Sequence, residues 1–154
     1  MFLYLVQHAE AKKEDEDPER GLTDKGFRDI ARTALFARDR GVSVAAIYHS
    51  GKKRAMQTAQ TIAGYLRPEM GFPQTDGSFP MDDPMIWADR LARMNKDIML
   101  VGHLPHLARL ASLLLCGDAD RNYVDFKMAG IVCMKRSHDG HYAVEWMMVP
   151  EMMR

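Results

Sequence analysis

The sequence has few cysteines, no excess of either charge and no long apolar run. Its two cysteines, Cys116 and Cys133, lie in apolar runs, which is typical of small buried side chains in a reducing compartment and not of a disulfide framework. The 21 basic residues balance the 21 acidic ones, so no overall field attracts nucleic acid. No segment approaches the roughly 20 apolar residues of a membrane helix. We therefore expect a cytoplasmic protein with no nucleic-acid or membrane partner.

Metal-binding motifs are missing as well. The chain has no HExxH motif and no run of carboxylates suited to magnesium. His106 follows His103 at a spacing that metal ligands use on helices, but no third ligand accompanies the pair. We expect a site that needs no metal and no other cofactor.

Strand-like and helix-like segments alternate along the chain. Strands are predicted at residues 1–6, 42–50 and 96–103, and helices at 22–41, 51–66, 81–94 and 104–117. Thr23 and Gly41 are the expected caps of the first helix, and Ser50 is available to cap the second. Two apolar segments, 129–137 and 141–149, flank His-Asp-Gly and predict an antiparallel hairpin.

This order of elements predicts one domain over residues 1–154. Its fold class is α/β, a three-layer α/β/α sandwich whose central sheet is mainly parallel and carries an antiparallel C-terminal hairpin. In such sheets ligands bind beyond the carboxyl ends of the strands.

Polar side chains stand at these strand ends. Gln7 and His8 follow the first strand, Arg54 lies in the first turn of the helix after the second, and His103 follows the third. A helix N-terminus and an arginine fork both bind phosphate oxygens. A neutral imidazole is a competent nucleophile toward phosphorus, and a second one, if protonated, stabilises the charge that develops on the oxygens. The pattern favours phosphoryl transfer.

Four segments carry a family resemblance: LVQHAEA, ERGLTDKG, YHSGKKRAMQTAQTIA and MLVGHLPHLARLASLL. In order and spacing they resemble the histidine phosphatase superfamily, which includes the phosphoglycerate mutases, and the short chain is most similar to the SixA-type phosphohistidine phosphatases. The resemblance implies that His8 is the nucleophile and that Arg54 and His103 bind the phosphoryl group. It also implies that Arg20 approaches this group from the first loop.

The chain departs from the family pattern at two positions. Gln7 stands where the family has arginine before the nucleophile, and Gly51 stands where the family has proline after the serine. Gln7 still offers an amide hydrogen bond to phosphate but no charge, which predicts slower catalysis by roughly tenfold. The candidates for a general acid are Glu10, Asp82 and Asp83, and none of them stands out.

Other polar residues have a simpler interpretation. An arginine such as Arg20, placed before a helix cap, is equally able to pair with the acidic run EDEDPE. His49 is expected to end a strand and not to join the site, and Lys52 and Lys53 are either solvated or part of a field that attracts anions.

The sequence thus predicts a phosphatase for phosphohistidine on a protein partner, such as a histidine-containing signalling domain. Two alternatives stay open. One is a phosphomonoesterase for a small phosphorylated metabolite. The other is a weakly active or inactive phosphate-binding module, because of Gln7.

Overall fold

A mixed sheet in the strand order β2-β3-β1-β4-β5 forms the centre of the fold. The structure is a computed structural model and describes residues 1–153. Its elements are β1 (Phe2–Gln7), α1 (Asp24–Asp39), β2 (Ile47–His49), α2 (Lys53–Leu66), α3 (Pro84–Ala92), β3 (Ile98–Gly102), α4 (His106–Cys116), β4 (Ile131–Arg136), β5 (Tyr142–Met148) and the 3-10 helix η1 (Pro150–Met152).

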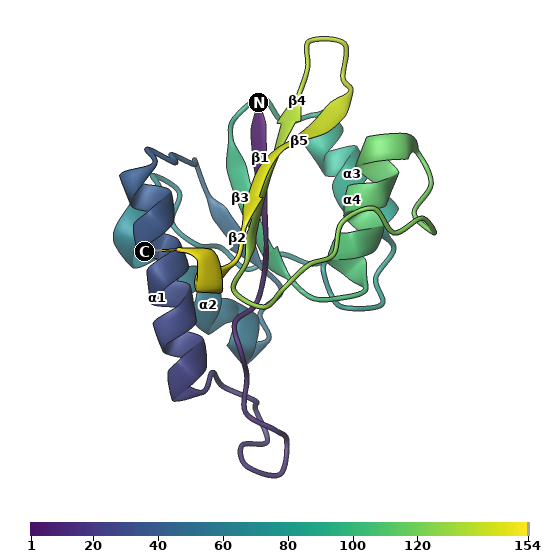
Figure 1. Ribbon diagram of the computed structural model, residues 1–154. Helices are drawn as coiled ribbons and strands as arrows, with labels where there is room; N and C mark the ends of the chain where they lie inside the picture. Colours follow the sequence, from purple (N-terminus) through teal and green to yellow (C-terminus); the bar gives the residue numbers. More distant parts are fainter. Residues whose placement is uncertain (154) are drawn as a thin grey trace.

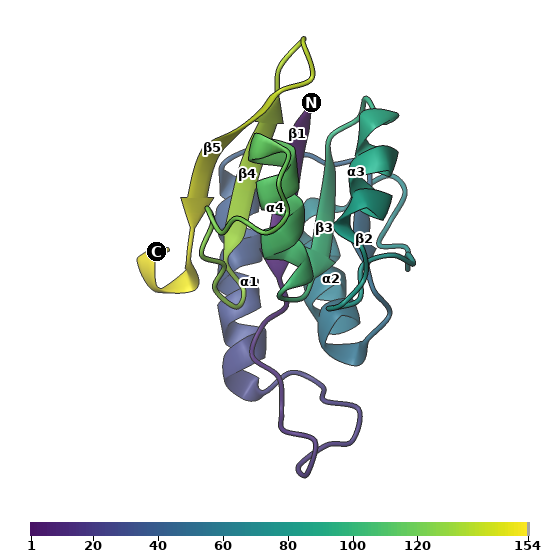
Figure 2. The ribbon, with the colours of Figure 1, turned by 90° about the vertical axis from the view of Figure 1, so that its right-hand side faces the viewer.

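Strands β1, β2 and β3 run parallel, and the hairpin β4–β5 completes one edge in antiparallel order. The predicted α/β class and the antiparallel C-terminal hairpin are confirmed. Figure 2 shows β5 at this edge, with α4 in front of the sheet. Among residues 1–153, no helix is both long and apolar enough to cross a membrane.

Helices cover both faces of the sheet, which gives the three predicted layers. Helices α1 and α2 lie on one side and α3 and α4 on the other (Figure 1). Side chains alternate along β1 accordingly: Tyr4 and Val6 join the core under α1 and α2, while Leu3 and Leu5 join the core under α3 and α4. This double burial explains why the first strand is a continuous apolar run.

Most predicted helix boundaries hold. The hydroxyl of Thr23 caps α1 by accepting from the backbone N–H of Gly26 at 2.9 Å, as predicted. The C-cap is Arg40 and not the expected Gly41, which follows it with a left-handed backbone at φ +75°. Gly26 also lets α1 pack closely against the chain after β1, since a Cβ there would lie 2.2 Å from the Glu10 carbonyl oxygen.

The region around the second strand differs from the prediction. Only Ile47–His49 pairs as β2, although Val42 and Val44 are buried before it. Helix α2 begins at Lys53, with Lys52 as an N-cap that makes no side-chain hydrogen bond, so the expected cap at Ser50 is wrong. Gly51 has φ +90°, and a Cβ there would lie 2.4 Å from Gln74 Nε2, so this turn requires glycine.

Candidate active site

Two imidazoles meet where β1 and β3 end. Gln7 pairs with Gly102 in the parallel register, so the residues that follow, His8 and His103, emerge side by side. The His8 backbone N–H donates to the Gly102 carbonyl at 3.1 Å, and the two ring centroids are 5.2 Å apart. The structure therefore brings together the two histidines that the sequence placed at strand ends.

The hydrogen bond of His8 fixes its tautomer. Nδ1 lies 2.8 Å from the carbonyl oxygen of Ala9. Because a carbonyl only accepts, Nδ1 carries the proton and Nε2 of the neutral ring keeps its lone pair. Burial lowers the pKa of His8 to about 4, and the charges of Arg54 and Arg20 act in the same direction, against the Ala9 hydrogen bond. At neutral pH, His8 is an uncharged imidazole with a free nitrogen.

His103 is also neutral in this site. Its Nε2 lies 2.6 Å from the Ser50 hydroxyl oxygen, and its Nδ1 is buried without a hydrogen-bond partner. Burial lowers the pKa of His103 to about 3, with further contributions from His8 and Arg54. A dianion placed between the rings would raise both pKa values again, because it favours the protonated forms.

Arg54 lies in the first turn of α2, as predicted, and part of its guanidinium is unsatisfied. Its Nε is buried and has no hydrogen-bond partner. Burial lowers the pKa of Arg54, as does the charge of Arg20, but a guanidinium stays protonated at neutral pH. The free N–H groups at the start of α2 lie in the same turn and have no side-chain cap. This end of α2 is suited to bind an anion.

Arg20 is held in the loop between β1 and α1 and reaches the same region. Its backbone is left-handed at φ +53°, and its Nε donates to the Lys12 carbonyl at 3.1 Å. The acidic residues near it pair with Lys53 instead, Glu19 at 3.3 Å and Asp17 at 3.7 Å. Arg20 and Arg54 line the same open hollow, and the charge of Arg20 lowers the pKa of both His8 and Arg54.

Helix α2 holds both loops of the site, through residues that the sequence analysis did not single out. The Thr58 hydroxyl oxygen accepts from the Ala9 backbone N–H at 3.0 Å and fixes the turn that carries His8. Gln57 Oε1 accepts from the Leu22 N–H at 2.8 Å and anchors the loop that carries Arg20. Both residues lie within the motif RAMQTAQ, and this motif is the sequence feature that could have identified them.

Ser50 and Gln7 lie next to the two histidines, Ser50 in contact with His103 and Gln7 directly before His8. The contact between Ser50 and His103 joins residues 53 positions apart, and it depends on the pairing of β2 with β3, which local sequence does not encode. Gln7, the last residue of β1, has a buried Oε1 with no hydrogen-bond partner. Rotation of its amide brings the NH2 group to the same place, where it can donate to an oxygen of a ligand.

The remaining histidines differ from this pair. His49 has both ring nitrogens bound to backbone, to Phe72 O at 3.1 Å and to Gly51 N–H at 3.0 Å, and therefore has a structural role. His106 is fully buried, and neither ring nitrogen has a hydrogen-bond partner. Within residues 1–153, no cluster of three or more His, Cys, Asp or Glu side chains is arranged to hold a metal ion.

The three candidate acids have separate environments. Glu10 accepts from the Thr23 hydroxyl at 2.7 Å, and Asp83 caps α3 through the Met85 N–H at 2.9 Å. Asp82 instead lines an open hollow that also includes Ser50. A second open hollow, of about 660 Å³, has both basic and acidic residues in its lining, which consists of Glu14, Pro18, Glu19, Arg20, Gly51, Lys52, Lys53, Arg54 and Met56.

The chain is similar to known proteins in part of its sequence and in its fold. Residues 3–73 match the model of the histidine phosphatase superfamily (branch 1). The fold is similar to that of the protein histidine phosphatase SixA complexed with tungstate (TM-score 0.86, 20% identity, 97% of each chain). It is also similar to a putative SixA from Agrobacterium tumefaciens (0.77, 22%, 97% of each chain).

A further similar structure is a mutant phosphoserine phosphatase from Entamoeba histolytica in complex with phosphoserine (TM-score 0.71, 18% identity, 95% of each chain). No curated protein matches the sequence. The matched segment includes His8, Arg20 and Arg54, and the shared fold extends over almost the whole chain. The similarity to the histidine phosphatase superfamily thus covers residues 3–73 in sequence and almost the whole chain in fold.

Proposed function

We propose that this protein is a metal-independent phosphatase that removes the phosphoryl group from phosphohistidine on a partner protein. The observation that carries the proposal is the state of His8: a neutral ring with Nδ1–H bound to Ala9 and a free Nε2 beside His103 and the arginines. Such a nitrogen can attack phosphorus without first losing a proton.

In the first step, the lone pair on His8 Nε2 attacks phosphorus. The Nε2–P bond forms as the P–N bond to the substrate imidazole breaks, and the departing imidazole keeps the electron pair and takes a proton from water. The phosphorylated His8 ring is then cationic, and its Nδ1–H remains hydrogen-bonded to the Ala9 carbonyl, which accepts more strongly from a charged donor.

The negative charge on the oxygens of the transferring phosphoryl group is stabilised by four residues, Arg54, His103, Gln7 and Arg20. Arg54 supplies a planar fork together with the uncapped start of α2. Burial lowers the pKa of His103 to about 3, and the dianion of the substrate raises it again, so that His103 becomes a cationic donor. In the second step, the oxygen of water attacks phosphorus and releases one proton to the solvent, while the Nε2–P bond breaks and its electron pair returns to His8, which leaves inorganic phosphate and the neutral ring.

Two features support a protein phosphohistidine as the substrate. The hollows beside the site are open, which suits a side chain presented by another protein better than a small molecule that must be enclosed. An imidazole is also a better leaving group than an alkoxide, so the reaction needs no strong general acid. The partner would be a signalling domain that carries phosphohistidine on its surface.

A phosphomonoesterase is the second candidate, and Asp82 favours it. This carboxylate lines the hollow next to Ser50, where it could protonate a departing alkoxide. A phosphoserine phosphatase is among the similar structures. A third candidate, a module that binds phosphate without turnover, is favoured by the missing charge at Gln7.

Hydrolysis of a phosphohistidine peptide and of a phosphoserine peptide of the same sequence, both with EDTA present, separates these candidates. We expect turnover of phosphohistidine that exceeds turnover of phosphoserine and is lost in His8→Ala. His49→Ala is the matched control, since His49 is a buried strand-end imidazole bound only to backbone. Faster hydrolysis of phosphoserine would favour the phosphomonoesterase, and tight tungstate binding without any turnover would favour the binding module.

A further inference from the structure

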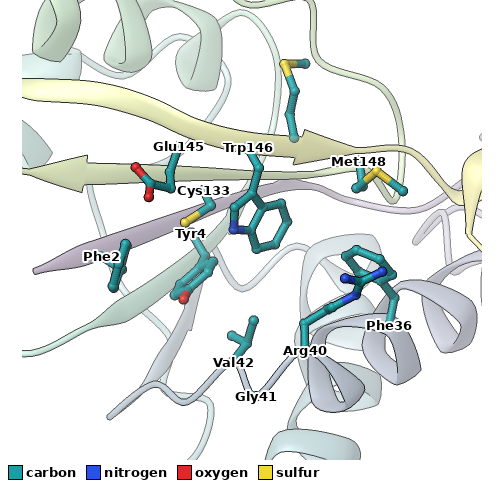
Figure 3. Close-up of a pocket in the computed structure, with 11 residues that line it drawn as sticks. Phe2, Tyr4, Phe36, Arg40, Gly41, Val42, Cys133, Glu145, Trp146 and Met148 are labelled. Carbon is teal, nitrogen blue, oxygen red and sulfur yellow. The ribbon is translucent and has the colours of Figure 1, made fainter.

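A third hollow, separate from the two beside the candidate active site, lies at the opposite end of β1 from His8. It has a volume of about 630 Å³, within the range of roughly 300–1,000 Å³ that is usual for ligand pockets. It is bounded by the start of β1, the end of α1 and strand β5 (Figure 3). Its lining residues are Phe2, Tyr4, Phe36, Arg40, Gly41, Val42, Cys133, Glu145, Trp146, Met147 and Met148. None of them belongs to the candidate active site.

The inside of this hollow is aromatic. The Trp146 ring packs against Tyr4 and Phe36, with ring centroids 6.1 Å and 5.9 Å away, and the Phe36 contact is edge-on. Phe36 and Trp146 are only partly buried, so apolar ring surface remains open to an incoming group. A flat apolar ligand would bury this surface and stack against the indole.

Two charged residues stand on different sides of the indole. Figure 3 shows Arg40 beside Phe36 and Glu145 beyond Trp146. The Arg40 guanidinium lies 5.1 Å from the centre of the Phe36 ring, which orients it along the hollow. Within residues 1–153, Arg40 forms no ion pair, whereas Arg38, two residues earlier, pairs with Asp39 at 3.1 Å. The Arg40 guanidinium is thus available to bind an anionic group of a ligand.

We propose that this hollow binds a small planar aromatic molecule with a single anionic group. The ring lies among Tyr4, Phe36 and Trp146, and the anion accepts from the guanidinium of Arg40. Glu145 repels a second anionic group at the other end, so the ligand binds in one orientation. This site is independent of the phosphatase proposal.

The probe is 2-naphthoate, and its uncharged analogue 2-naphthamide is the matched comparison. Both are titrated into the full chain and followed by calorimetry and by backbone amide NMR. Excess inorganic phosphate is present to occupy Arg54. We expect 2-naphthoate to bind with a Kd of about 1 mM or tighter and to shift the amides of residues 40–42 and 144–148. We expect 2-naphthamide to bind about fivefold to tenfold more weakly.

Arg40→Gln removes the charge at the surface without disturbing the aromatic rings. We expect it to weaken 2-naphthoate to the level of 2-naphthamide and to leave 2-naphthamide binding and phosphohistidine hydrolysis unchanged. Arg38→Gln, the control on the same turn of α1, should alter neither ligand. The proposal is overturned if 2-naphthoate causes no shifts at these residues, if both probes bind equally to the unmodified chain, or if a second copy of the chain occupies the hollow and excludes the probe.

Discussion

The two ends of the central sheet use arginine in opposite ways. At the end where β1 begins, Arg136 donates to the carbonyl oxygens of Leu91 at 2.6 Å and Met94 at 2.5 Å, around the end of α3. At the end where β1 stops, Arg54 keeps a buried Nε without a hydrogen-bond partner. Arg136 satisfies carbonyl groups at the end of a helix, whereas Arg54 leaves a buried donor unsatisfied, which lowers stability. Gln7 and His103 also keep buried polar atoms without partners at the end where β1 stops.

Two histidines at the carboxyl ends of the parallel strands show the same contrast. His49 has both nitrogens bound to backbone, whereas His8 uses one nitrogen for Ala9 and leaves the other free. Both are buried, and both follow or end a parallel strand. The two imidazoles differ here by one unused lone pair, and neither burial nor position in a strand reveals this difference.

The largest effect is expected from His8→Asn. Asparagine keeps a polar group near Ala9 but has no ring nitrogen to attack phosphorus, so kcat should fall at least about 1,000-fold, as for other covalent nucleophiles. Single-turnover hydrolysis of a phosphohistidine peptide measures this. Residual activity within tenfold of the unmodified chain would contradict the assignment of His8.

Exchanging arginine for lysine at each end of the sheet tests whether Arg54 serves activity while Arg136 serves stability. Arg54→Lys keeps the charge but loses the planar fork, and kcat/KM should fall about 100-fold with little change in stability. Arg136→Lys should lower the free energy of unfolding by about 1–3 kcal/mol, because one of two charge-assisted hydrogen bonds is lost, and leave kcat/KM unchanged. Steady-state kinetics and urea unfolding on both variants check the pair. The comparison fails if both variants lose the same property.

Stability should fall in mild acid because of the site. Burial lowers the pKa of His8 to about 4, while the unfolded chain has the ordinary value near 6.5. The unfolded state therefore binds more protons as the pH falls from 6.5 to 4, and His8 alone removes roughly 2 kcal/mol between pH 7 and pH 5. Urea unfolding at both pH values, with His8→Asn as the comparison, measures this. An equal loss in His8→Asn would show that His8 is not the cause.

A smaller effect is expected from Gln7→Arg. Restoring the charge beside His8 should raise kcat about tenfold if Gln7 lines the phosphoryl site. Gln7→Leu, which removes the amide but keeps much of its volume, should lower kcat. Single-turnover hydrolysis of the phosphohistidine peptide measures both variants, and a slower Gln7→Arg would show that the glutamine is adapted to its position.

Much of this fold follows from local patterns. The apolar run of β1, the Thr23 cap and the glycine after α1 predict elements that the structure contains, because each depends on neighbours in the chain. The extent of β2 and the role of Ser50 could not be predicted in this way. Val44 and Ile47 are both buried, but only Ile47 meets a partner strand, and Ser50 reaches His103 through that same pairing.

The site was partly predictable for the same reason. Strand ends and the family motifs identified the positions of His8, Arg54 and His103, since neighbouring parallel strands bring their carboxyl ends together. The supporting contacts of Gln57 and Thr58 cross between loops and a helix. The free Nε2 of His8 depends on one local hydrogen bond to Ala9, and only coordinates reveal it.

The most direct test is to trap the phosphorylated enzyme. Rapid mixing with a phosphohistidine peptide, quenching in alkali and mass spectrometry of the digested chain should locate one phosphoryl group on the peptide that contains His8. The adduct should resist alkali, break down in acid, and be absent in His8→Asn. Turnover without this adduct, or a phosphoryl group found on another residue such as Ser50, would contradict the account.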